Sequence, residues 1–200
     1  MPAKSGRPPR SSSELLEIRD KIATEARKLF RDEGFAAVSI RRLAEAAGCA
    51  PMTIYAHFDG KADILRFLWA DVLRQVFDDI KQELDRTNLP HDRLVAASRV
   101  YLRHWLTNPD HFRLVFLSNG VARADVQTFM ADPATLHHFD LMSGLVSLVA
   151  PAGADVKART DMLVAGLTGI ALCLNTVKDY PWSDPDVMAG ALVAAATGPL

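Results

Sequence analysis

Cysteine is scarce in this sequence, and long apolar runs are missing. The 200 residues contain two cysteines, Cys49 and Cys173, in unrelated surroundings, so neither a disulfide framework nor a metal-binding set is implied. The longest apolar run, from Met162 to Leu174, is shorter than the roughly 20 residues that a membrane-spanning helix needs. Two glycines and a threonine interrupt this run, and we interpret it as a buried helix. We therefore expect no membrane contact.

The first residues, MPAKSGRPPRSSSE, contain no apolar stretch typical of a secretory signal, so we expect a cytoplasmic protein. Residues 1–13 include Lys4, Arg7 and Arg10 but no acidic residue, which indicates a flexible basic arm. Such an arm is either a disordered terminus or a segment that follows DNA phosphates or a minor groove.

No group of residues indicates catalysis or metal binding. Cys49 has no base at a suitable spacing in the sequence. His137 and His138 are adjacent on an expected helix, where successive side chains point about 100° apart, so together with Asp140 they do not converge on one ion. We therefore expect no enzyme, no metal and no cofactor. A helical enzyme remains a remote alternative.

Charge is unevenly distributed along the chain, although the net charge is only −1. Residues 1–61 contain 11 basic and 8 acidic side chains, whereas the remainder contains 12 basic and 16 acidic ones. The basic N-terminal part is the part expected to contact a nucleic acid. Hydrophobic residues make up 49% of the sequence, so a sizeable core is expected.

Two short helices joined by a tight turn are predicted between Ile40 and Lys61. Ser39 is a good N-cap for the first helix, and Gly48 can take the left-handed conformation that ends it. Apolar positions of the first helix share one face: Ile40, Leu43, Ala44 and Ala47. Slender groups occupy the outer face of the second helix: Met52, Thr53 and Tyr55. This pattern is typical of a helix-turn-helix, whose second helix lies in the DNA major groove.

The remaining pattern is helical, with no segment typical of a β-strand and no internal repeat. A first helix is predicted from about Ser12 to Glu33 and a long one from about Lys61 to Asp85. Pro133 is expected to divide residues 123–149 into two helical pieces. We predict an all-α protein of about nine helices, with three parts: the arm (1–13), a helix-turn-helix domain (14–60) and a second helical domain (61–200).

Residues 18–65 resemble the N-terminal DNA-binding domain of TetR/AcrR-type transcriptional regulators. The resemblance runs without gaps through Ala26, Phe30, Gly34-Phe35, Ser39-Ile40, Leu43-Ala44, Ala47-Gly48, Ile54-Tyr55, His57-Phe58, Lys61 and Leu65. A second pattern resembles the C-terminal domain of one subgroup: Tyr101, Asn108-Pro109, Phe112-Arg113 and Phe116. The resemblance implies a variable helical second domain that binds small molecules and dimerises.

The resemblance also implies phosphate contacts in the helix-turn-helix. Tyr55 and Lys61 are expected to contact phosphates, and Ser39 is at a position where the family often has a phosphate-contacting Thr or Ser. His57 either contacts a phosphate or packs inside the domain. Arg42 is either a phosphate contact or a solvated surface charge. Phosphate contacts supply most of the affinity of such a domain.

Base recognition is expected to depend on few hydrogen bonds. Arg41 is at a position that the family uses for base contact, where a guanidinium can bind guanine O6 and N7. Pro51 and Met52 cannot make bidentate hydrogen bonds and suit contact with thymine methyl groups, whereas Thr53 can do either.

An effector is expected among aromatic and mixed side chains of the second domain: Tyr101, His104, Trp105, Phe112, Phe116, Phe139 and Met142. Ligand pockets are mostly apolar, and no cluster of acids or arginines marks a charged ligand, so a hydrophobic or aromatic effector is favoured. The alternative for each of these residues is a place in an ordinary core.

Small residues are frequent in the last two helices, and they permit close helix approach. By the resemblance, these helices form a homodimer that places two DNA-reading helices on a palindromic operator. The expected protein is a repressor that a small-molecule effector releases from double-stranded DNA. The alternative is a protein of this fold that answers to a protein partner or to no effector, or that activates transcription.

Overall fold

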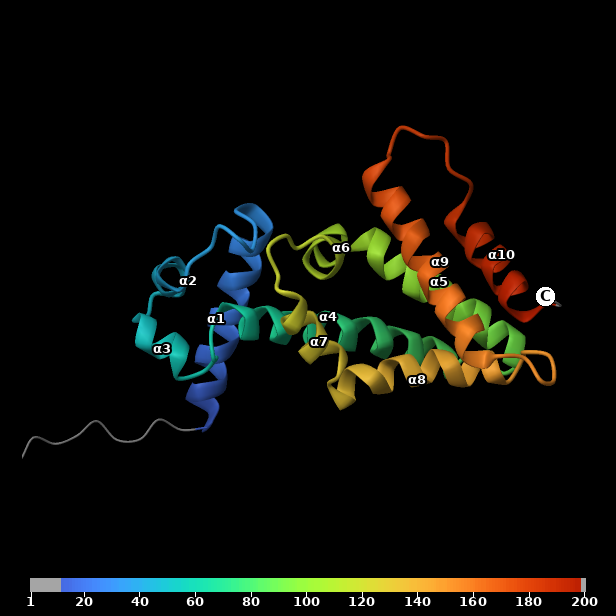
Figure 1. Ribbon diagram of the computed structural model, residues 1–200, viewed down its shortest axis with the longest axis horizontal. Coiled ribbons are helices and arrows are strands. Elements are labelled where there is room, and N and C mark those ends of the chain that lie inside the picture. The colour runs from blue at the N-terminus through green and yellow to red at the C-terminus, as the bar shows by residue number, and fades with distance from the viewer. Residues whose placement is uncertain (1–11, 199–200) are drawn as a thin grey trace, which may run out of the picture. The chain divides into compact units, whose positions relative to one another are not determined.

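The computed structural model describes residues 12–198, and every regular element within that range is an α-helix. The predicted all-α fold is confirmed (Figure 1). The helices of the described part are α1 (Ser12–Asp32), α2 (Ile40–Ala47), α3 (Pro51–Tyr55), α4 (Lys61–Leu84), α5 (Pro90–Thr107), α6 (Pro109–Phe116), α7 (Arg123–Met130), α8 (Pro133–Ser147), α9 (Val156–Thr176) and α10 (Pro185–Thr197). Residues 1–11 of the expected basic arm lie outside the described residues.

The described part has ten helices, and the two pieces expected on either side of Pro133 are the separate helices α7 and α8. The side chain of Asp132 begins α8 by accepting hydrogen bonds from the N–H groups of Ala134 and Thr135, at 2.9 and 3.2 Å. Pro133 takes the first helical position, where an N–H would have no helical partner. The predicted interruption at Pro133 is therefore confirmed, and the proline marks the start of a helix.

The chain divides into two compact units. The first unit contains residues 12–68 and a second, short segment, Ser118–Val121, which connects α6 to α7. The second unit contains residues 69–117 and 122–198. Helix α4 begins in the first unit and continues into the second, so the chain passes from one unit to the other along α4 and again on each side of Ser118–Val121.

Helices α1 to α3 and the start of α4 supply the core of the first unit. Its most deeply buried members are Ile22, Ala26, Leu43, Ile54, Ile64 and Leu65. Phe30 and Phe35 pack edge to face, with ring centroids 5.2 Å apart. The Arg19 guanidinium lies 4.8 Å from the ring centroids of both Phe58 and Phe67, a cation–π arrangement that ties α1 to the start of α4.

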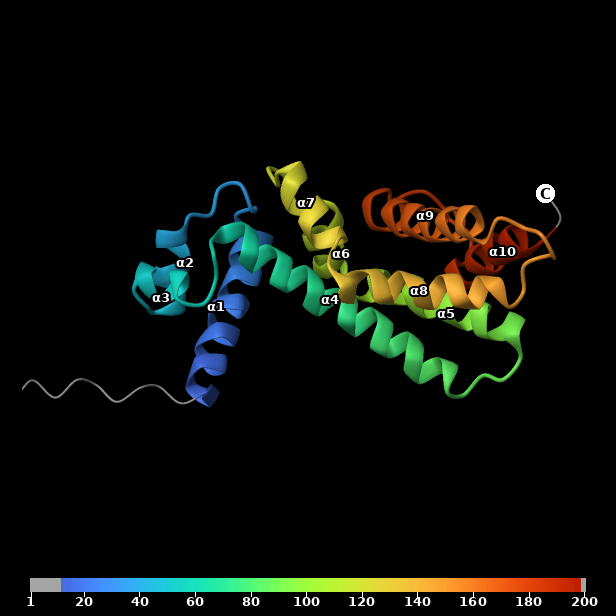
Figure 2. The same cartoon turned by 60° about the horizontal axis from the view of Figure 1, so that its bottom comes forward.

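Helix α5 is the centre of the second unit, where it packs against α6, α8, α9 and α10. Helices α9 and α10 also contact each other, as Figure 2 shows. A Cβ atom at Gly166 would come within 2.9 Å of the end of the Leu192 side chain, so a larger residue there would require this leucine to move. Arg159 is buried, and its Nη1 donates to the carbonyl oxygens of Ala196 and Gly198, at 2.7 and 2.9 Å. These bonds satisfy carbonyls at the end of α10.

None of the helices within residues 12–198 combines the length and the apolar character needed to cross a membrane.

Candidate nucleic-acid interface

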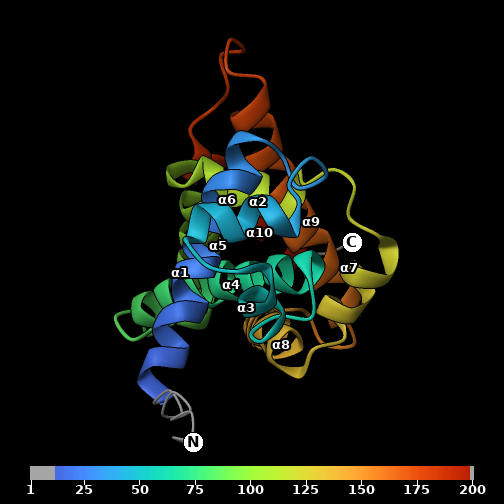
Figure 3. The same ribbon diagram turned by 90° about the vertical axis from the view of Figure 1, so that its left-hand side faces the viewer.

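Both ends of α2 are fixed by local hydrogen bonds, as the sequence predicts. The Ser39 hydroxyl caps the first turn by accepting a hydrogen bond from the Arg42 N–H at 3.1 Å. Gly48 has a φ of +64°, and its N–H donates to the Glu45 carbonyl. The Cys49 N–H donates to the Ala44 carbonyl, which completes a Schellman motif. Helix α2 therefore stops at a defined residue, and the turn to α3 has a defined direction (Figures 1 and 3).

Helix α3 has one buried anchor and an exposed outer face. Pro51 takes the first helical position after Ala50, which caps the helix without a side-chain hydrogen bond. Ile54 is fully buried, whereas Met52 is 76% exposed and Tyr55 is 53% exposed. Pro51 is also exposed, and Thr53 is half-buried. The predicted groove-facing side chains thus share an accessible surface that is poor in hydrogen-bonding groups.

Arg41 and Arg42 are adjacent on α2, but their guanidinium groups have different surroundings. Arg42 donates to Oε1 of Glu33 from both Nε and Nη2, at 3.1 and 3.0 Å, and its Nη1 lies 3.8 Å from Oε2 of Glu45. Arg41 is exposed and forms no hydrogen bond or ion pair with any residue between 12 and 198. Arg41 therefore has a full set of donors available, while Arg42 is partly neutralised.

Lys61 links the start of α4 to the turn that follows α1. Its Nζ donates to the carbonyl oxygens of Phe35 and Ala36, at 2.6 and 3.3 Å, and lies 4.4 Å from the centroid of the Phe35 ring. Partial burial lowers the pKa of the Lys61 ammonium group. An ammonium group has three N–H donors, so one remains for the phosphate contact that the sequence predicts. His57, the other residue of this region that is a candidate for phosphate contact, is half-buried in the segment that connects α3 to α4.

Five of the seven candidate effector residues form one cluster in the second unit. Trp105 is fully buried at its centre, and its ring centroid lies between 5.1 and 6.1 Å from those of its aromatic neighbours: Tyr101, His104, Phe112 and Phe116. Phe116 is the exposed member. The other two candidates are on α8, where Met142 is buried and Phe139 is half-buried without a ring contact to another aromatic side chain of the described residues.

Hydrogen bonds extend from this cluster to neighbouring helices. The Tyr101 hydroxyl lies 2.9 Å from Oγ1 of Thr168, and burial raises the pKa of Tyr101. His104 Nδ1 lies 3.4 Å from Oδ2 of Asp79, and His104 Nε2 lies 3.2 Å from Nδ1 of His111. Burial lowers the pKa of His104, and Asp79 opposes that shift in part. These contacts mark a packed core with internal polar bonds.

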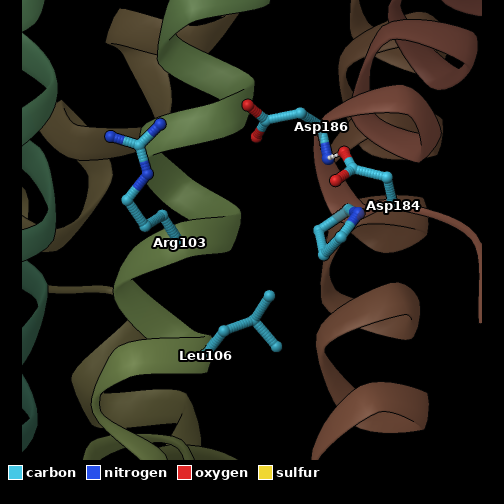
Figure 4. A pocket seen from close by; sticks show the side chains of 5 residues that line it. Arg103, Leu106, Asp184 and Asp186 are labelled. Carbon is cyan, nitrogen blue, oxygen red and sulfur yellow. Dashed lines mark hydrogen bonds between the residues drawn. The ribbon is translucent and has the colours of Figure 1, made fainter.

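A pocket of about 180 Å³ lies between α5 and the start of α10, and none of the seven candidates lines it. Figure 4 shows Arg103 and Leu106 on one wall and Asp184 and Asp186 on the other, and Pro185 completes the lining. These residues come from helices that are distant in the sequence and follow no motif, so no sequence pattern predicts that they line a pocket. Within residues 12–198, no group of three or more His, Cys, Asp or Glu side chains is arranged to hold a metal ion.

The capped α2, the short α3 and its exposed face define a helix-turn-helix protein. Residues 22–67 match the family model described as bacterial regulatory proteins of the tetR family. The helix-turn-helix part of the chain is thus similar to the DNA-binding region of the TetR family of transcriptional regulators.

Three curated relatives are similar to part of the chain. The transcriptional repressor KstR2 of Mycolicibacterium smegmatis is 29% identical over 44% of this chain and 43% of its own length. The regulator HbdR of an Aromatoleum species is 29% identical over 60% of this chain and 52% of its own. The transcriptional activator FasR of M. smegmatis is 26% identical over 78% of this chain and 69% of its own. The chain thus spans about half the length of the first two relatives.

Two solved structures have the same fold. The fatty acid degradation regulator FadR of Bacillus halodurans aligns with a TM-score of 0.74 and 16% identity over 98% of both chains. FadR of Bacillus subtilis, solved in complex with stearoyl-CoA, aligns with a TM-score of 0.73 and 14% identity over 89% of this chain and 97% of the other. At these identities the likeness concerns the fold alone.

Proposed function

We propose that this protein is a cytoplasmic, homodimeric repressor that binds a palindromic operator and releases it when a hydrophobic effector binds. The observation that carries the proposal is the exposed surface of the helix-turn-helix, which includes Met52 and Tyr55 on α3 and the unpaired guanidinium of Arg41 on α2. Apolar contact with thymine methyl groups and one bidentate arginine–guanine pair form a sufficient reading set for a short half-site.

The proposed homodimer forms through α9 and α10, which would contact the same helices of a second copy of the chain. Both helices expose apolar side chains, including Met162 and Leu172 on α9 and Val187 on α10. Apolar surface of this kind favours contact with a partner, and the small residues nearby permit close helix approach. A two-fold dimer through these helices would present two copies of α3 to successive major grooves.

The proposed effector is apolar because the candidate residues around Trp105 are mostly apolar. Two similar folds support this class: the FadR structures belong to regulators of fatty acid degradation or were solved with stearoyl-CoA. To release DNA, such an effector must bind the DNA-incompetent state more tightly than the DNA-bound state. The proposed path of the change is α4, which both units share.

The second candidate function is a DNA-binding regulator that does not respond to a small-molecule effector. Trp105 and Phe112 are fully or almost fully buried by other side chains, which favours a filled core at this position. The similarity to the activator FasR likewise leaves activation of transcription as the alternative to repression.

The proposal is tested by selecting duplexes from a randomised DNA pool with the wild-type protein. Affinities for a selected and a scrambled duplex are then measured at one salt concentration, because phosphate contacts make affinity depend on salt. The Arg41→Ala variant is expected to lose about 1–3 kcal/mol on the selected duplex and much less on the scrambled one. The Arg42→Ala variant is the matched control, since Arg42 is adjacent but ion-paired with Glu33.

Equal losses of Arg41→Ala on both duplexes would contradict the assigned base contact, and failure to recover any duplex would contradict the proposed function. Stearoyl-CoA is then added to the complex of wild-type protein and selected duplex, and native mass spectrometry identifies any small molecule that copurifies. Release of the duplex by stearoyl-CoA, or by another compound with a long apolar chain, supports the proposed effector. Action without a small-molecule effector is favoured if stearoyl-CoA does not dissociate the complex and if no small molecule copurifies with the protein.

A further inference from the structure

The short segment Ser118–Val121 joins the first compact unit although it is distant from α1–α4 in the sequence. Within that unit, Gly120 lies directly against Ala36 in the turn between α1 and α2. A Cβ atom placed at Gly120 would be 2.9 Å from the Ala36 Cβ and 3.6 Å from its Cα. The first distance is shorter than real Cβ contacts allow, so this approach requires a residue without a side chain.

The turn that Gly120 contacts is also held from the start of α4. Lys61 Nζ binds the carbonyl oxygens of Phe35 and Ala36, so the backbone at Ala36 has a hydrogen-bonding support and a packing support. Ser39, which caps α2, follows three residues later, and Arg41 is in the first turn of that helix. A shift of the turn at Ala36 would therefore move the start of α2.

We infer that Gly120 is a positioning residue for DNA binding. Its bare backbone supports the turn at Ala36, and this support sets the place of α2 and of Arg41. The inference rests on the proposed DNA-binding function, but it concerns a segment outside the helix-turn-helix and a connection other than α4. It assigns the segment between α6 and α7 to the DNA-reading unit.

Two glycines make a controlled test possible, because they share the same φ and differ in surroundings. Gly120 and Gly153 both have a φ of +80°, which L-residues rarely adopt. A Cβ at Gly153 would meet nothing within 4 Å, whereas a Cβ at Gly120 would meet Ala36. Alanine at either position therefore adds the strain of a positive φ, and only alanine at Gly120 adds the clash.

The experiment compares Gly120→Ala, Gly153→Ala, Ala36→Gly and the double variant Ala36→Gly/Gly120→Ala with wild type. Dissociation constants are measured for a duplex that the wild-type protein selects from a randomised pool, well below each variant's melting temperature. Gly120→Ala is expected to weaken binding about tenfold, and Gly153→Ala by less than about twofold. The double variant removes the clashing Ala36 methyl group and is expected to return to within about threefold of wild type.

Amide hydrogen exchange of the Phe35–Arg42 backbone provides a second measurement that does not depend on DNA. Exchange there should rise in Gly120→Ala and fall back in the double variant, while Gly153→Ala leaves it unchanged. If Gly120→Ala does not fold, the double variant still decides, because it keeps the strain of φ +80° and lacks the clash.

Equal losses in Gly120→Ala and Gly153→Ala, or a double variant as weak as Gly120→Ala, would overturn the positioning role while leaving the proposed function intact. A wild-type protein that selects no duplex would overturn both.

Discussion

In the first unit, the side chains expected to read the bases are mostly exposed, and they lie on two short helices, α2 and α3. Met52 and Tyr55 point to solvent while Ile54 alone anchors α3 in the core. In the second unit, most of the candidate side chains are part of the core, with Trp105 and Phe112 buried at its centre. In the first unit, the exposed residues with a proposed DNA contact are therefore different from the buried residues that stabilise the fold. In the second unit, the same residues would have to bind the effector and stabilise the fold.

The largest effect is expected where candidate residues and core coincide. Trp105→Ala should lower the free energy of unfolding by about 3–5 kcal/mol, because a large buried ring is replaced by a cavity. Tyr55→Ala, on the exposed face of α3, should change it by less than about 0.5 kcal/mol. Urea unfolding of both variants measures the difference. A loss below about 1 kcal/mol for Trp105→Ala would contradict a filled core and indicate that the ring borders an open cavity.

A smaller effect is expected at the turn of the helix-turn-helix. Gly48→Ala should destabilise the protein by about 1–2 kcal/mol, because alanine is unfavourable at a φ of +64°. Gly144→Ala is the control: this glycine is within α8, and its added Cβ would meet nothing within 4 Å. There alanine should stabilise the helix by up to about 1 kcal/mol. Thermal unfolding measures the change in stability of both variants. If Gly48→Ala stabilises the protein as Gly144→Ala does, glycine is not needed at the left-handed turn.

The smallest effect is expected from pH, and it should originate in the second unit. Burial lowers the pKa of His104 and of His138, so the unfolded chain binds their protons at a higher pH than the folded chain. Protonation therefore favours unfolding, and stability should fall as the pH drops below about 6.5.

His104→Gln should reduce this loss between about pH 7.5 and about pH 5.5, as urea unfolding at both values would measure. The His104→Gln/His138→Gln variant should reduce it further. A wild-type protein whose stability rises as the pH falls through this range would contradict the assigned direction of both pKa shifts.

Local rules were sufficient to predict much of the first unit. Ser39 and Gly48 act within one turn of their own positions, so the sequence predicts both ends of α2, and the structure confirms them. In the second unit, the interruption predicted at Pro133 is confirmed, and it likewise depends on local features, the proline ring and the neighbouring Asp132. The contacts of Arg41 and Tyr55 with DNA stay predictions, although both side chains are accessible.

Contacts between distant residues could not be predicted in the same way. The ion pair of Arg42 with Glu33 and the hydrogen bonds of Lys61 to the turn after α1 depend on how helices pack. The grouping of aromatic side chains around Trp105 is suggested by their spacing on α5 and α6, but the pattern does not distinguish a pocket from a core. The pocket that Arg103 lines requires α10 to lie beside α5, which no motif indicates.

The DNA-reading unit is discontinuous in the sequence. A fragment that ends at Leu68 contains the whole helix-turn-helix and the region that matches the family model, but it lacks Gly120 and its neighbours. A chimaera that receives only this N-terminal fragment would place Ala36 against a foreign segment between α6 and α7. Exchange of reading units between relatives therefore has to carry two pieces of chain, and a tight glycine contact at the second piece would limit which partners are compatible.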